Sequence, residues 1–136
     1  MKVSVVYYSR TGNTRKVAEA MAAAAGCEAR SLDGIRAPVE ADALLIGCAI
    51  YAGRVPPEVS RFIEGLDPGK IARAAVFCTS VKGEKANDIM RGLLAERGIA
   101  VEDAGFSCRG KFMWKNAGCP SADDLESAKE FAAKFR

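Results

Sequence analysis

The sequence contains no histidine, so it lacks the side chain that most often acts as a general base or binds zinc. Catalysis by a Ser-His-Asp or Cys-His arrangement is therefore excluded. The five cysteines include no Cys-x-x-Cys pair, which argues against a zinc site and is typical of reduced thiols in a cytoplasmic protein. No apolar stretch reaches the roughly 18 residues that would span a membrane, and MKVSVVYY at the start reads as a strand rather than a signal peptide.

Apolar runs alternate with helical patterns along all 136 residues, which predicts one domain, residues 1–136, of the α/β class. Because the runs are almost continuously apolar, we expect parallel strands that are buried on both faces by helices. The predicted strands cover residues 2–8, 27–32, 43–50, 74–78 and 99–107. The predicted helices cover residues 14–25, 57–66 and 85–97, and a last helix is capped by Ser121 with Asp124 three residues on.

The carboxyl ends of the predicted strands are the expected location of a ligand, because open parallel sheets bind ligands there. Four loops meet this edge, at residues 9–16, 49–57, 79–88 and 107–120. All candidate binding segments therefore lie along this edge of the sheet.

The first of these loops reads SRTGNT, residues 9–14, and lies directly before a helix. N–H groups not used by the helix, together with the positive end of its dipole, attract an anion at that position. Ser9, Thr11 and Thr14 add hydroxyl donors, Asn13 adds an amide, and Gly12 lets the backbone curl tightly. No GKS or GKT of a Walker loop follows, so the pattern predicts a phosphate site without magnesium. An ordinary Ser/Thr-rich helix cap is the alternative.

The segment SRTGNT resembles the phosphate loop of the flavodoxin family, S/T-x-T-G-x-T, at every fixed position. GCAIYAGRVPPEVSRFI is similar to that family's third strand, flavin-contacting loop and third helix. AAVFCTSVKG is similar to its fourth strand and second flavin-contacting loop, and residues 106–135 are similar to the end of many small members. The resemblance implies a five-stranded parallel sheet of order 2-1-3-4-5 between two helical layers, and this order comes from the family rather than from the residues.

The resemblance also implies one non-covalently bound FMN. Its phosphate would contact Ser9, Arg10, Thr11, Gly12, Asn13 and Thr14. Its ring would contact the loops after the third and fourth strands, at Ala49, Ile50, Tyr51, Ala52, Gly53, Thr79, Ser80, Val81, Lys82 and Gly83. Tyr51 is the candidate for one ring face. The second loop lacks the aromatic residue common in the family, so Trp114 is the candidate to cover the other face. No side chain is expected to act in catalysis or to bind a metal.

Basic residues are concentrated in the four loops, which hold nine bases and two acids, whereas the rest of the chain holds 11 bases and 15 acids. The nine bases are Arg10, Arg15, Lys16, Arg54, Lys82, Lys85, Arg109, Lys111 and Lys115. The resemblance implies that the reduced flavin is an anion, and each positive charge at about 10 Å would stabilise it by roughly 1 kcal/mol before salt screening. We therefore hypothesise a higher reduction potential than in acidic flavodoxins, and a partner with an acidic surface or an anionic substrate.

The implied function is electron transfer between a reductase and an acceptor, with no nucleic acid, no membrane span and an undetermined oligomeric state. The main alternative is an FMN-dependent NAD(P)H or quinone oxidoreductase, or a flavodoxin-like oxidase, that acts on an anionic substrate. A protein with the fold but without bound flavin is a further alternative. CAIYAGR, residues 48–54, also has the Cys-x5-Arg spacing of cysteine-dependent phosphatases, which need a low-pKa thiolate. Cys108 and Cys119 flank the last loop and could form a redox-sensitive pair.

Overall fold

A computed structural model describes residues 2–9, 12–35, 39–49, 54–79, 85–108 and 121–135. Strands and helices alternate through these ranges, with a short 3-10 turn before β3 and another before β4. The elements in chain order are β1 (Val3–Tyr7), α1 (Asn13–Ala25), β2 (Ala29–Ser31), η1 (Leu32–Gly34), β3 (Ala41–Ala49), α2 (Pro57–Glu64), η2 (Pro68–Lys70), β4 (Ile71–Thr79), α3 (Lys85–Glu96), β5 (Phe106–Cys108) and α4 (Ala122–Ala133).

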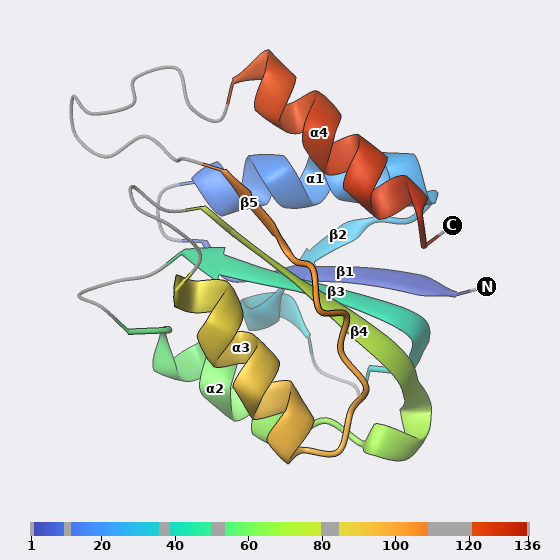
Figure 1. Cartoon of the computed structure of the whole chain (residues 1–136), viewed down its shortest axis with the longest axis vertical. Coiled ribbons are helices and arrows are strands. Elements are labelled where there is room, and N and C mark those ends of the chain that lie inside the picture. The colour runs from blue at the N-terminus through green and yellow to red at the C-terminus, as the bar shows by residue number, and fades with distance from the viewer. Residues whose placement is uncertain are drawn as a thin grey trace.

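The five strands form one parallel sheet in the order β2-β1-β3-β4-β5, which confirms the order expected from the resemblance. The sheet grows outward in both directions from β1 and β3, which pair over residues 3–7 and 43–47. Helices cover both faces: α1 and α4 lie together on one side of the sheet, and α2 and α3 lie on the other (Figure 1). The fold is therefore the predicted three-layer arrangement.

The central strands are buried on both faces, which explains their continuous apolar composition. In β3, Ala43 and Leu45 belong to the core beneath α1 and α4, whereas Leu44, Ile46 and Cys48 belong to the core beneath α2 and α3. This alternation follows from the two-residue period of a strand. Two separate apolar cores hold the sheet between its helical layers.

The helix boundaries agree with their sequence signals. The apolar residues of α1 recur at helical spacing and are all buried, at Val17, Ala18, Met21, Ala22 and Ala25. Gly26 ends α1 with φ at 77°, a left-handed conformation that glycine adopts at little cost, and its N–H bonds to the last turn. Ser121 and Asp124 form the predicted capping box at the start of α4.

The prediction of a fifth strand over residues 99–107 was wrong in extent. Only Phe106–Cys108 pairs as a strand with β4, and Val101 makes an isolated bridge to Ala74. Between them the chain detours at Gly105, where a Cβ atom would lie 2.9 Å from the Val76 carbonyl oxygen. The short strand must therefore be held by contacts other than a continuous ladder.

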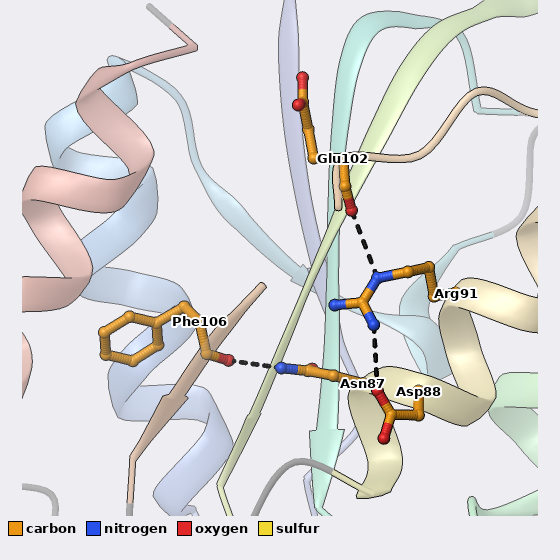
Figure 2. A network of polar contacts seen from close by, with 5 residues as sticks. All are labelled: Asn87, Asp88, Arg91, Glu102 and Phe106. Carbon is orange, nitrogen blue, oxygen red and sulfur yellow. Dashed lines mark hydrogen bonds and ion pairs between the residues drawn. The ribbon is translucent and has the colours of Figure 1, made fainter. Parts of the chain in front are cut away.

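Side chains of α3 supply those contacts, as Figure 2 shows. Asn87 Nδ2 donates to the Phe106 carbonyl at 3.0 Å, and Arg91 Nε donates to the Glu102 carbonyl at 3.3 Å. Arg91 is itself held by Asp88 at 3.0 Å. The two carbonyl groups lie on either side of the interruption between Val101 and Phe106, so these bonds attach both sides of it to α3.

Two further strands differ clearly in length from the prediction. The second strand is shorter than residues 27–32, because only Ala29–Ser31 pairs with β1. The fourth is longer than residues 74–78, because Ile71 and Arg73 already pair with β3. Its first residues alternate between buried Ile71 and exposed Ala72, so they lack the continuous apolar signal of the remainder.

Candidate functional site

The carboxyl edge of the sheet is where α1, α2 and α3 begin, at the left of Figure 1. The helices follow β1, β3 and β4 respectively, so their N-terminal ends lie beside one another along this edge. Because the strand order reverses between β1 and β3, the edge is also the switch point at which such sheets bind ligands.

The turn from β1 into α1 has a geometry suited to an anion. Gly12 has φ at 90°, and a Cβ atom placed there would meet nothing within 4 Å, so the turn is open on that side. Ser9 Oγ accepts a hydrogen bond from the Gly12 N–H at 2.9 Å, which leaves the Ser9 hydroxyl proton available as a donor. The turn is thus closed by its own first residue.

The start of α1 adds backbone donors to this turn. The first bond of the helix runs from the Lys16 N–H to the Gly12 carbonyl at 3.1 Å. The N–H groups of Thr14 and Arg15 are therefore not used within the helix, and Gly12 provides no side-chain cap for them. Together with the helix dipole, this set of donors fits a phosphate ester.

Thr14 lies in the first turn of α1 and is joined to the end of β4. Its Oγ1 is 2.7 Å from Thr79 Oγ1, a hydrogen bond in which either hydroxyl can be the donor. Both residues are almost wholly buried, with exposed fractions of 1% and 2%. The contact connects the turn after β1 with the strand end at which the second predicted ring-contacting segment begins.

Tyr8 and Glu58 form a contact at the same edge that the sequence reasoning missed. Tyr8 follows β1, and its hydroxyl donates to Glu58 Oε2 at 2.5 Å, in the first turn of α2. The Tyr8 N–H also bonds to the Gly47 carbonyl of β3 at 3.0 Å. The available signal was an acid directly after tandem prolines, which is where a helix favours negative charge.

Glu58 adds a negative charge to this edge. It was not counted from the sequence because the second loop was taken to end at Pro57. Arg15 pairs with Glu19 at 3.4 Å, with both side chains more than half exposed. Lys16, Arg54 and Lys85 are exposed and form no ion pair with other residues that the structure describes. Four of the nine counted bases are therefore described at this edge, and Glu58 lowers the net charge of the edge by one. The other counted bases, Arg10, Lys82, Arg109, Lys111 and Lys115, lie outside the described residues.

Cys48 contradicts the phosphatase alternative. It lies within β3, is completely buried, and its Sγ donates to Met90 Sδ at 3.7 Å. Burial, with a smaller contribution from neighbouring Cys78, raises the pKa of the Cys48 thiol to about 12. A cysteine nucleophile needs the opposite, a lowered pKa and an accessible sulfur, so this alternative is wrong.

The remaining predicted contacts are divided between described and undescribed residues. Ser9, Gly12, Asn13, Thr14, Ala49 and Thr79 are described, and all lie at the carboxyl edge. Arg10, Thr11, Ile50, Tyr51, Ala52, Gly53, Ser80, Val81, Lys82, Gly83 and Trp114 lie outside the described residues. Cys119 does too, so its pairing with Cys108 stays a prediction.

Two classes of site find no support in the described part of the chain. Its side chains include no group of three or more acidic or cysteine residues that could hold a metal ion. None of its helices is both long enough and apolar enough to cross a membrane.

The sequence of this chain matches a known protein family. The family model described as a flavodoxin domain matches residues 4–111. No curated protein sequence matches the chain significantly.

Similar folds occur in solved structures. A flavodoxin from the domain Archaea is 21% identical, with a TM-score of 0.83, and the match covers 99% of this chain and 96% of that one. Oxidised Flavodoxin 2 from Bacillus cereus is 20% identical, with a TM-score of 0.73 and coverage of 99% and 97%. Rubredoxin oxygen:oxidoreductase from Desulfovibrio gigas is 19% identical, with a TM-score of 0.73, and the match covers 96% of this chain but 34% of that one. At these identities the likeness shows the fold.

Proposed function

Because the chain belongs to the flavodoxin family, we propose that it binds one FMN without a covalent link and carries electrons between a reductase and an acceptor. Residues 1–136 would form one flavodoxin-like domain. The bound flavin would supply the electron-transfer chemistry, and the chain would bind, orient and electrostatically tune it.

The observation that carries this proposal is the open turn between β1 and α1. Its left-handed glycine, its Ser9 hydroxyl and the backbone donors at the start of α1 all belong to this one short turn. A phosphate monoester is the part of FMN that such donors recognise, and no metal ion is needed to bind it there.

The other proposed FMN contacts lie at the ends of β3 and β4. Ala49 and Thr79 end the two strands that precede the proposed ring-contacting loops, so any ring bound there would lie next to β3 and β4. The roles of Tyr51 and Trp114 as ring covers remain predictions from the resemblance. Exposed Lys16, Arg54 and Lys85 favour a redox partner whose docking surface is acidic.

A pair of glycine substitutions tests the proposal. Gly12 and Gly26 both have positive φ, and a Cβ atom at either would meet nothing within 4 Å. Gly12→Ala and Gly26→Ala should therefore cost similar stability, about 1–2 kcal/mol each, from backbone strain alone. Only Gly12 belongs to the proposed phosphate turn, so only Gly12→Ala should weaken FMN binding.

The measurement is quenching of flavin fluorescence as the purified protein is titrated into FMN, with urea unfolding of each variant in parallel. The proposal expects saturable binding by the wild type and by Gly26→Ala, and weaker binding by Gly12→Ala. Wild-type protein that leaves FMN fluorescence unchanged at every concentration would contradict FMN binding. Equal affinities for the two variants would contradict the role of the turn.

A further inference from the structure

The buried hydroxyl pair Thr14 and Thr79 has one proton more than its mutual hydrogen bond uses. Each hydroxyl carries one proton and can accept two hydrogen bonds. Their contact at 2.7 Å uses one of the two protons, and no other hydrogen bond to either hydroxyl is formed within the described residues. Because both side chains are shielded from solvent, bulk water does not compensate the second proton. A buried donor without an acceptor is costly, so this proton requires an acceptor beyond the described residues.

The location of the pair indicates which acceptor that is. Thr14 belongs to the first turn of α1, where the helix N–H groups are not used by the helix itself. Thr79 instead ends β4, where its backbone is held by Ala49 of β3 on one side and Cys108 of β5 on the other. One hydroxyl is therefore at the turn, and the other is fixed to the sheet behind it.

We propose that Thr79 is a positioning residue for the phosphate turn, and this inference rests on the proposed binding of FMN. The Thr79 hydroxyl donates to Thr14 Oγ1, so the Thr14 proton is directed to a phosphate oxygen. In this arrangement both protons are used, and the chain of bonds runs from the sheet to the anion. Each bond in such a chain polarises the next, and a hydrogen bond to a charged group is stronger than one between neutral groups.

Substitution of Thr79 by valine tests the proposal with little change in shape. Valine keeps the branched side chain and the strand preference of threonine but removes the hydroxyl. Without that donor the orientation of the Thr14 hydroxyl is no longer fixed, and the affinity for FMN should fall about tenfold. Thr79→Ser keeps the hydroxyl and should stay within about threefold of the wild type.

Riboflavin separates an effect on the phosphate from an effect on the fold, because it has the same ring but no phosphate. Fluorescence titration with riboflavin should give Thr79→Val the same affinity as the wild type, within about twofold. Circular dichroism confirms that each variant is folded before titration. An equal loss of affinity for FMN and riboflavin would overturn the proposal, since Thr79 would then act on the ring or on the structure as a whole.

A double substitution tests whether Thr79 acts through Thr14. Thr14→Val should weaken FMN binding by itself, and adding Thr79→Val should then cost less than about twofold. Full additivity of the two losses would overturn the relay. Failure of the wild type to bind FMN would instead contradict the proposed function and remove the basis of this inference. The wild-type titration thus distinguishes the two failures.

Discussion

Gly47 allows a sharp test of how closely β3 and β4 are packed at the carboxyl edge. It lies opposite Phe77 in the register of these strands, and both residues are buried. A Cβ atom on Gly47 would overlap the Cδ2, Cε2 and Cζ atoms of the Phe77 ring, well inside the 3.0 Å below which such contacts essentially never occur. Gly47→Ala therefore cannot be accommodated unless the ring moves by roughly 1 Å or more.

The cost of that movement is set by the surroundings of the ring. Phe77 is fully buried in the core that α1 and α4 complete, so the ring has no solvent-facing direction in which to move. Overpacking of this kind typically costs 1–3 kcal/mol, and we expect about 3 kcal/mol for Gly47→Ala. That is a large part of a typical total stability of about 5–15 kcal/mol.

Urea unfolding of a double-mutant cycle measures whether the clash is the cause. Phe77→Leu alone should cost about 1–2 kcal/mol, because it leaves a partly filled space. In the double variant the new methyl group occupies that space, so the combined cost should fall short of the sum by about 1–3 kcal/mol. Gly92→Ala is the matched control: this glycine is exposed in α3 with nothing within 4 Å of its Cβ position, and the change should stabilise by about 0.5–1 kcal/mol. Strict additivity of Gly47→Ala and Phe77→Leu would refute the reasoning.

Two further predictions concern charge. Burial raises the pKa of the Cys48 thiol from 9.0 to about 12, so its contribution to stability is complete below pH 9 and lost as the pH rises toward 12. The stability difference between the wild type and Cys48→Ala should therefore shrink by about 1.4 kcal/mol per pH unit above pH 9 in urea unfolding, and a constant difference would contradict the raised pKa. Lys85→Glu, at the start of α3, should lower the potential for full reduction of bound FMN by on the order of 50 mV at low ionic strength. Lys70→Glu, exposed before β4 at the opposite edge, should change it far less in the same redox titration, and equal shifts would contradict a local effect.

The central fold could be predicted because its signals are local and repeated. The apolar runs of β1, β3 and β4 follow from burial on both faces. The buried apolar residues of α1 and α4 recur with the helical period. The fifth strand could not be delimited in this way. Residues 99–107 have the composition of a strand, and the residues that contact the chain on both sides of the break, Asn87 and Arg91, come from a helix earlier in the chain.

In the candidate site, too, features formed by neighbouring residues were predictable and contacts between distant residues were not. The turn proposed to bind phosphate was predictable, because its donors, its glycine and the helix that follows are adjacent in sequence. The contacts between Thr14 and Thr79 and between Tyr8 and Glu58 join residues 65 and 50 positions apart, so no local pattern indicates them. The ring-contacting residues were expected from family resemblance alone, and most of them lie outside the described residues, so they remain predictions.

The two outermost strands of the sheet, β2 and β5, are only three residues long. A long exposed strand offers a row of unpaired peptide groups on which a second molecule can add its own strand, the first step toward aggregates. Within the described residues such a row is short on both sides, and the chain at Gly105 lies against β4 where the ladder is interrupted. The irregular fifth strand thus limits edge-to-edge association between molecules, and a regularised version with a continuous ladder would be more prone to it.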